Sequence, residues 1–149
     1  MIFVGNIREL RPGAFDTAYA IMRFYKPSGT GWIKHLPVLS PDTRLFQTFR
    51  QLQSEGKWNE DAFQKVYVPR FLSQIASDPM AADALNDLFR RSKAGESIGL
   101  CCTCTNEKSC HRSIIAGLLQ GAGADVRLAS GKDFSTYFEQ YKALRTTAK

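Results

Sequence analysis

One segment, residues 98–119, constrains this chain more than any other: an apolar run leads into a cysteine-rich polar loop and then into a helical pattern. Its sequence is IGLCCTCTNEKSCHRSIIAGLL. The near-continuous apolar character of Ser97–Cys104 predicts a strand that is buried on both faces, as in a parallel sheet. Ser109 is expected to cap the following helix, so that Cys110 lies in its first turn. Such a junction brings backbone N–H groups, thiols and charged side chains together.

Short apolar runs elsewhere complete the predicted sheet. Met1–Asn6, Thr17–Tyr25 and Asp125–Ala129 have the length and composition of strands. At the C-terminal end a strand, a helix, a strand and a closing helix at about 132–146 follow one another, which is typical of parallel sheets. The predicted fold is α/β, a single-domain three-layer sandwich over residues 1–149 with a mainly parallel central sheet and flanking helices.

The middle of the chain has a helical period. Asp42 and Asn59 precede two runs in which apolar residues recur three and four positions apart. Pro69 lies inside the second run, where a kink or a break is expected. Asp78-Pro79 matches a helix cap followed by proline at the first helical position. The sequence therefore predicts three helices between the second strand and the segment described first.

Length and composition narrow the class of protein. A chain of 149 residues with 44% hydrophobic residues is long enough to bury a core. No apolar run approaches the roughly 20 residues that span a bilayer, and the start lacks a signal peptide. We therefore expect a cytoplasmic protein without a membrane partner. The net charge of +6 favours an anionic small molecule or nucleic acid as partner, although the basic residues are spread along the chain. The oligomeric state is left open.

The four cysteines allow three interpretations. In a reducing compartment they do not indicate a disulfide framework. A structural zinc site is not expected, because no second pair of closely spaced ligands follows, and neither a metal nor another cofactor is predicted. Cys101 and Cys102 are interpreted as packing residues within the strand. Cys104, at the end of the strand, fits either packing or the site.

The third interpretation is chemical and concerns Cys110. A thiol at a helix start lies in the positive end of the helix dipole, which lowers its pKa. Arg112 adds positive charge, and His111 adds a titratable group. The loop Thr105–Ser109 is expected outside the carboxyl end of the strand, where open α/β sheets bind ligands. The Cys-x5-Arg pattern of phosphatases is absent, because Cys110 follows Cys104 at that distance.

Two further residues are candidates for the same cleft. His35 precedes Pro37 in an irregular segment that is apolar enough to pack near the strand ends. A lone histidine more often has a structural role, and the same holds for Tyr67, which could face the cleft from a helix. A metal site built from Cys104, Cys110 and one of the two histidines ranks behind the other interpretations.

These motifs resemble those of the bacterial and phage proteins of the domain of unknown function 488 (DUF488) family. The similarity is carried by an apolar strand that runs into Leu-Cys, a polar loop, and Cys-His-Arg at residues 110–112. Trp32–Ser40 resembles the proline loop of the family, and Met1–Gly5 its first strand. The family's Asp-Val-Arg is replaced by Asn6-Ile7-Arg8. The resemblance implies an α/β fold and a shared site around residues 110–112.

Two functions from different classes follow. In the first, Cys110, His111 and Arg112 bind an anionic, nucleotide-like or nucleic-acid-derived ligand and act on it as a hydrolase or transferase, with Cys110 or His111 as nucleophile or acid–base group. The binding residues expected around them are Cys104, Thr105, Ser109, His35 and Tyr67. In the second, the chain is a non-catalytic interaction module with a basic surface, and its cysteines are structural.

Overall fold

Five parallel strands form one sheet within residues 1–27 and 31–147, which are the residues that the computed structural model describes. Their order across the sheet is β3-β2-β4-β1-β5, so β4 lies at the centre. The strands are β1 (Ile2–Asn6), β2 (Thr17–Ala20), β3 (Ile33–His35), β4 (Ile98–Cys102) and β5 (Val126–Leu128). Every pairing is parallel, which confirms the predicted α/β class.

The central strand β4 is buried on both faces, as its apolar sequence predicted. Ile98 and Leu100 belong to the core cluster on the helical side, with 0% exposure. Cys101 belongs to the cluster on the opposite side. Gly99 also faces that side, where an added Cβ would contact the side chains of Leu10 and Phe15. Two distinct cores therefore pack against β4.

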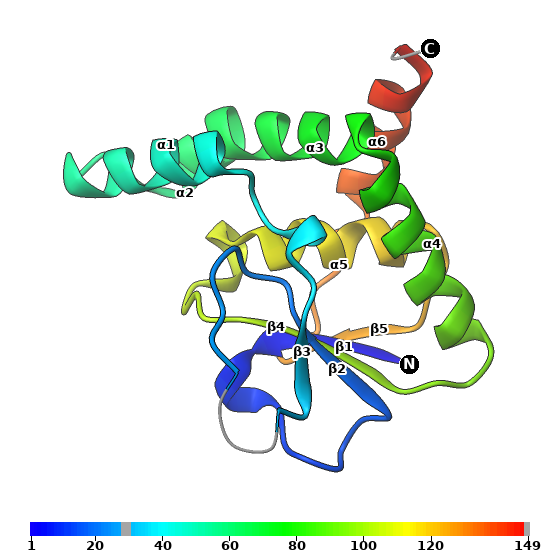
Figure 1. The fold of residues 1–149 in the computed structure, drawn as a ribbon. Helices are drawn as coiled ribbons and strands as arrows, with labels where there is room; N and C mark the ends of the chain where they lie inside the picture. Colours follow the sequence, from blue (N-terminus) through cyan, green and yellow to red (C-terminus); the bar gives the residue numbers. More distant parts are fainter. Residues whose placement is uncertain (28–30, 148–149) are drawn as a thin grey trace.

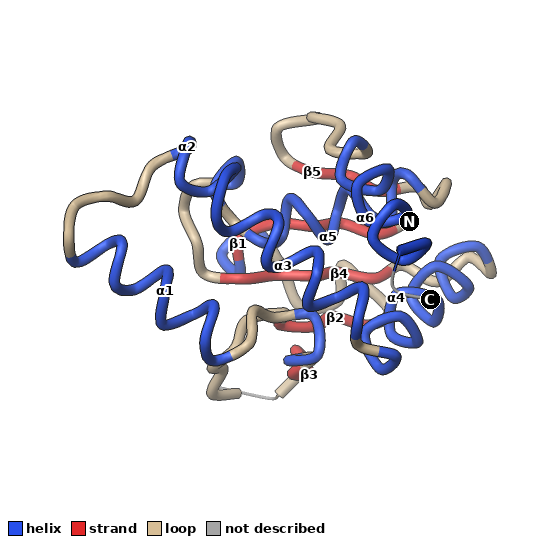
Figure 2. The backbone as a smooth tube through the Cα atoms, turned by 90° about the horizontal axis from the view of Figure 1, so that it is seen from above, coloured by secondary structure: helices blue, strands red, loops and turns tan. Residues whose placement is uncertain are grey.

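The α-helices gather over one face of the sheet (Figures 1 and 2). They are α1 (Thr43–Ser54), α2 (Glu60–Ala62), α3 (Val68–Ser77), α4 (Pro79–Lys93), α5 (His111–Gly121) and α6 (Thr136–Thr147). The opposite face is covered by the connections on either side of β2, including the 3₁₀ turn Ile7–Glu9 (Figure 1). α5 lies between the sheet and α3, so the helix start after β4 is enclosed by other elements.

Three local expectations need correction. The segment around His35 was expected to be irregular, but Ile33–His35 forms β3, which pairs with β2. β2 ends at Ala20 and does not continue to Tyr25, because its pairing with β3 and β4 stops there. Ser109 lies in the 3₁₀ turn Glu107–Ser109 and is not the helix cap. The N-cap of α5 is Cys110, with extended backbone and no side-chain capping hydrogen bond. The predicted helix start is thus displaced by one residue.

Pro69 changes the hydrogen-bonding pattern of its helix. A π-helical turn covers Phe63–Tyr67, and the N–H of Val68 donates to the carbonyl of Phe63, five residues earlier. α3 then begins at Val68, with Pro69 in its first turn, where no N–H is required. The wider turn keeps both Phe63 and Tyr67 buried. π-turns of this kind are a recognised cause of helix distortion and are frequent at functional sites.

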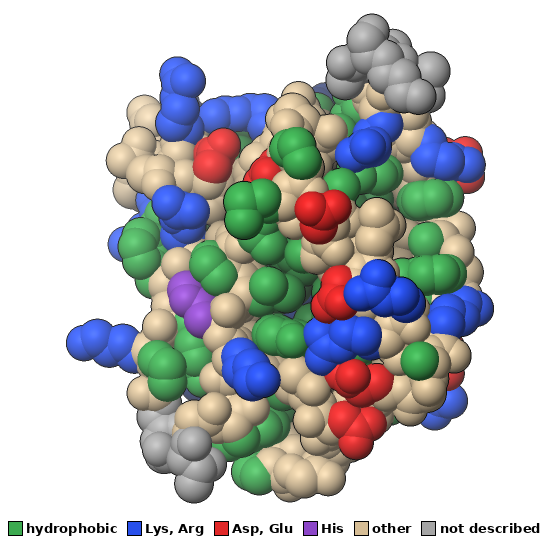
Figure 3. Space-filling model, turned by 45° about the vertical axis from the view of Figure 1, so that its right-hand side comes forward, with side chains coloured by type: hydrophobic (Ala, Val, Ile, Leu, Met, Phe, Trp, Pro, Cys, Tyr) green, Lys and Arg blue, Asp and Glu red, His purple; other side chains and the backbone are tan. Residues whose placement is uncertain are grey.

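The outer surface carries mixed charge. On the face shown in Figure 3, basic and acidic side chains alternate with hydrophobic ones. Some of these charges pair within one helix, as Arg90 and Arg91 do with Asp87 in α4. None of the helices between residues 1 and 147, outside 28–30, has the length and apolar character needed to cross a bilayer.

The close approach of α5 to the segment before α6 depends on Gly117. A Cβ at this position would lie 2.1 Å from the carbonyl oxygen of Phe134. We predict that Gly117→Ala lowers the free energy of unfolding by about 1–3 kcal/mol, because the backbone at Phe134 must move away. Chemical denaturation measures this loss. Asp83→Ala, at an exposed position of α4, is the control and should change little. An unchanged denaturation midpoint for Gly117→Ala would contradict the packing.

Candidate functional site

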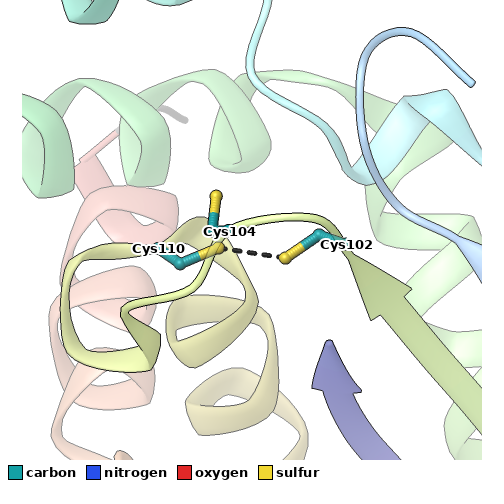
Figure 4. A group of neighbouring side chains, drawn as sticks. All are labelled: Cys102, Cys104 and Cys110. Carbon is teal, nitrogen blue, oxygen red and sulfur yellow. Dashed lines mark hydrogen bonds between the residues drawn. The ribbon is translucent and has the colours of Figure 1, made fainter. Parts of the chain in front are cut away.

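Three thiols converge where β4 ends and α5 begins. Cys102 is the last residue of β4, Cys104 lies in the loop, and Cys110 caps α5. The three Sγ atoms lie within 4.8 Å of one another. Figure 4 shows the side chains of Cys102 and Cys110 pointing at each other, with 3.1 Å between their sulfurs, while Cys104 points to one side. The closest contact is therefore a pair, with the third thiol beside it.

The guanidinium of Arg112 is buried against this pair. Arg112 is only 4% exposed. Nη1 donates to the Sγ of Cys102 at 3.2 Å and also to the carbonyl of Cys104. In the described part of the chain, Arg112 forms no ion pair with a carboxylate, and its Nε has no hydrogen-bond partner. A buried cation needs a countercharge. The sulfur of Cys102 is the group positioned to supply it.

The surroundings concentrate one negative charge on Cys102. Hydrogen bonds from the thiols of Cys104 and Cys110, followed by the positive charges nearby, lower the pKa of Cys102. The hydrogen bond to Cys102 raises the pKa of Cys104 to about 12. Burial raises the pKa of Cys110, and its hydrogen bonds add to this. These opposite pKa shifts favour ionisation at Cys102, beside two thiols and a guanidinium, over ionisation at Cys104 or Cys110.

This result differs from the expected lowered pKa at Cys110. The helix dipole acts on that thiol, but Cys110 is 2% exposed and lies beside a sulfur that already carries the charge. Desolvation opposes ionisation, and a second thiolate beside the first is repelled by it. The lowered pKa therefore belongs to Cys102, and Cys110 keeps its proton.

His111 is held in a single tautomer. Its Nε2 lies 2.5 Å from the carbonyl oxygen of Ile21, which can only accept, so Nε2 carries the proton. Nδ1 is then left as an acceptor, 3.7 Å from the Sγ of Cys110. Burial lowers the pKa of His111, which keeps the imidazole neutral. A neutral imidazole whose free nitrogen faces a thiol is arranged to accept the proton of that thiol.

Asn6, at the end of β1, fixes the backbone of the cysteine loop. It lies opposite Cys102 in the parallel pairing of β1 with β4. Its Nδ2 donates to the carbonyl of Cys104 at 3.0 Å and to that of Thr103 at 3.3 Å. The carbonyl of Cys104 therefore accepts from Asn6 and from Arg112. These bonds hold the loop in the position that brings Cys104 near the other two thiols.

The three thiols border a cavity of about 540 Å³ at the carboxyl end of the sheet. The opposite wall is aromatic and is formed by the side chains of Phe24, Phe46, Phe49, Trp58 and Tyr67. The rings of Phe49 and Trp58 meet edge to face at 4.7 Å, and Tyr67 continues the row to Phe71, which touches the ring of His111. Arg23 and Arg50 also line the cavity, and no carboxylate does among the described residues.

The structure brings together six of the eight residues that the sequence singled out. Those that line the cavity are Cys104, Cys110, His111, Thr105, Ser109 and Tyr67. Arg112 lies behind the thiols and does not line the cavity. It contacts the sulfur of Cys102, which does line the cavity. His35 lies outside the lining, and its Nε2 bonds to the carbonyl of Met22 at 2.8 Å.

Sequence reasoning missed Cys102 and most of the aromatic wall. Cys102 was assigned to packing because it lies in an apolar strand, yet its position at the carboxyl end places its sulfur in the cavity. The alternation of faces along the strand, which separates Cys102 from Cys101, was a usable signal. Phe46 and Phe49 carry no such signal, because their spacing is that of an ordinary core helix, and Trp58 lies in the connection between α1 and α2.

The geometry of the thiols bears on metal binding. They are a group of side chains close enough to share one ion, and sulfur favours thiophilic metals. Two sulfurs bound to a tetrahedral zinc at about 2.3 Å each would lie about 3.8 Å apart. The sulfurs of Cys102 and Cys110 are closer than this, at 3.1 Å. This spacing fits a thiol–thiolate hydrogen bond better than a preformed zinc site.

Comparison with known proteins identifies one match. The family model described as "DUF488-N3a: Active DUF488-N3 subclade" matches residues 17–123. The matched region includes β4, the cysteine loop and the start of α5, and it also contains the aromatic wall. A comparison with curated proteins and one with solved structures each found no match.

We predict a strong energetic coupling between Arg112 and Cys102. Cys102→Ala leaves a buried guanidinium without its countercharge and should lower the free energy of unfolding by about 3 kcal/mol or more. In the double variant Cys102→Ala/Arg112→Met the loss should be smaller than the sum of the two single losses, because no unpaired charge remains. Chemical denaturation of the four proteins gives the coupling energy.

Cys101→Ala, combined with Arg112→Met, is the control, since Cys101 is a buried thiol whose side chain points to the opposite face of β4 from that of Cys102. Its effect should add to that of Arg112→Met within about 0.5 kcal/mol. Simple additivity for the Cys102 pair as well would contradict the pairing of the guanidinium with a thiolate.

Proposed function

The chain belongs to the DUF488 family, and from that premise we propose that it is a thiol enzyme whose cavity binds an anionic, nucleotide-like ligand. The observation that carries the proposal is the meeting of three features in one cavity: a charged thiol cluster, an aromatic wall and two arginines. Cavities of a few hundred Å³ at the carboxyl end of a parallel sheet are typical small-molecule sites.

The lining supports a planar ligand with negative charge. The rings of Phe49 and Trp58 provide an apolar surface on which a base can stack. Arg50 lies over the ring of Phe46, 5.9 Å from its centre, and Arg23 bonds to Thr43, so both guanidinium groups are oriented at the wall. Arginine is suited to phosphate because its fork of donors matches phosphate oxygens. In the resulting arrangement, the base of the ligand stacks on the aromatic wall and its phosphate faces the two arginines.

Each of the groups at the site has a separate role in the proposed reaction. The Cys102 thiolate, stabilised by Arg112, is the nucleophile that attacks the ligand. Cys110 keeps its proton and can donate it to the leaving group. Water or another acceptor then displaces Cys102 as the thiolate, and the proton it loses returns to Cys110, directly or through Nδ1 of His111 beside it. The reaction class is that of a hydrolase or transferase with a covalent thiol intermediate.

A second candidate, a binding module without catalysis, is favoured by one observation. Cys110 is 2% exposed and Cys102 is 1% exposed, so both thiols lie deep in the wall of the cavity. In this alternative the thiolate and Arg112 stabilise the fold, and the cavity binds its ligand unchanged. We further propose that the protein works in the cytoplasm, because its four cysteines are free thiols, which a reducing compartment maintains.

We predict that adenosine monophosphate binds in the cavity and that adenosine binds more weakly, because it lacks the phosphate. Arg50→Ala should weaken the binding of the monophosphate at least about fivefold, by the loss of one charge-assisted contact. Arg44→Ala is the matched control, since Arg44 is an exposed arginine of the same helix that does not line the cavity. Isothermal titration calorimetry measures the four affinities: the monophosphate and adenosine with the native chain, and the monophosphate with each variant.

Equal affinities for adenosine and its monophosphate, or equal effects of the two arginine variants, would refute the anionic ligand. To separate the enzyme from the binding module, the protein is incubated with a mixture of common nucleotides and the products are separated by chromatography. The enzyme predicts a nucleotide that disappears with the native chain and persists with Cys102→Ala. The binding module predicts no change with either protein.

A further inference from the structure

We propose that Cys102 and Cys110 form a thiol–disulfide exchange pair, in which Cys102 attacks a small disulfide that enters the cavity and Cys110 releases it. This activity uses the thiolate of the proposed function but does not depend on a nucleotide ligand. The two residues are separated by seven positions in the chain and are brought together by the loop between β4 and α5.

The distance between the two sulfurs carries the inference. At 3.1 Å they are in hydrogen-bond contact and point toward each other (Figure 4). A disulfide bond of about 2.05 Å requires them to approach by only about 1 Å. Both residues line the same cavity, so a mixed disulfide formed on one sulfur stays within reach of the other.

The two sulfurs have different surroundings, and this difference indicates which sulfur reacts first. Cys102 receives a hydrogen bond from Nη1 of Arg112 at 3.2 Å, and a guanidinium favours the thiolate, which is the attacking species in exchange. In the described part of the chain, no guanidinium or ammonium hydrogen-bonds to the sulfur of Cys110, which faces Nδ1 of His111 at 3.7 Å. Cys102 is therefore the first nucleophile, and Cys110 is the resolving thiol, with His111 as its base.

Each step balances without a further reactant. The Cys102 thiolate attacks one sulfur of R–S–S–R, forms the mixed disulfide Cys102–S–S–R and releases RS⁻. Nδ1 of His111 takes the proton of Cys110, whose thiolate then attacks the Sγ of Cys102. A Cys102–Cys110 disulfide forms and a second RS⁻ leaves, protonated by His111 or by water. The two cysteines are oxidised by two electrons and the small disulfide is reduced by two.

The other cysteines do not take these roles. Cys101 precedes Cys102 in β4, so its side chain points to the opposite face of the strand, and it does not line the cavity. Cys104 is half-buried and is the most accessible of the three clustered thiols, but its side chain points to one side of the Cys102–Cys110 contact (Figure 4). Its hydrogen bond to Cys102 raises its pKa. These two cysteines therefore serve as controls for reactivity that arises from exposure alone.

The experiment uses bis(2-hydroxyethyl) disulfide, a small neutral probe, with the full chain at neutral pH. Released 2-mercaptoethanol is measured by chromatography, and the protein is measured by mass spectrometry after the reaction is quenched with acid. The native chain should release two equivalents of 2-mercaptoethanol and end with a disulfide bond between Cys102 and Cys110. Cys110→Ser should stop at the mixed disulfide on Cys102 and release one equivalent.

Cys102→Ser should react at least about tenfold more slowly, because an ordinary thiol is only a few per cent ionised at neutral pH. Cys101→Ser should behave like the native chain, and Cys104→Ser should still end with the disulfide between Cys102 and Cys110. If Cys102→Ser fails to fold, peptide mapping of Cys110→Ser still identifies the attacked sulfur. Modification of Cys104 without a link between the pair would overturn the proposal, as would a metal ion in the purified native protein that holds all three thiols.

The result is separable from the proposed nucleotide site. Adenosine monophosphate binding is measured on the fully reduced protein, in which no exchange takes place. Intact binding together with absent exchange would overturn the exchange pair alone. Exchange without nucleotide binding would support the pair and refute the nucleotide ligand.

Discussion

The contact between the guanidinium of Arg112 and the sulfur of Cys102 is the interaction on which the site depends. Burial of a guanidinium costs several kcal/mol unless a negative group compensates it. No carboxylate does so for Arg112 among the described residues. A thiolate at 3.2 Å is the available countercharge. The same contact stabilises the fold locally and gives a cysteine the ionised form that reacts, so here stability and reactivity have one origin.

The fold places this contact by tying three separate elements to one loop. Asn6, from the end of β1, donates to the carbonyl of Cys104, to which Arg112 also donates. His111 reaches the carbonyl of Ile21 after β2 and so anchors the segment that forms one wall of the cavity. Because all three contacts lie at the carboxyl end of the sheet, the parallel topology is what makes the cavity and the thiol cluster neighbours.

The sequence was sufficient for the class of fold, and six of the residues it singled out line the cavity. The apolar run of β4 and the cap signals of Asp42, Asn59 and Asp78 predicted elements that the structure has, because they reflect local chemistry. The charge state of the thiols could not be predicted in this way. It depends on which sulfur meets Arg112 and on the desolvation of Cys110, and both are set by packing between distant segments. The aromatic wall depends likewise on the tertiary position of α1.

The most direct test of this account is the ultraviolet absorbance of the thiolate as a function of pH. The pKa of Cys102 is lowered in the folded chain, so its thiolate persists as the pH falls below the range in which free thiols titrate. The account predicts one thiolate per folded chain at pH 6, which is lost on unfolding and is absent in Cys102→Ala. An absorbance that rises only near pH 8–9, as for an ordinary thiol, would contradict it.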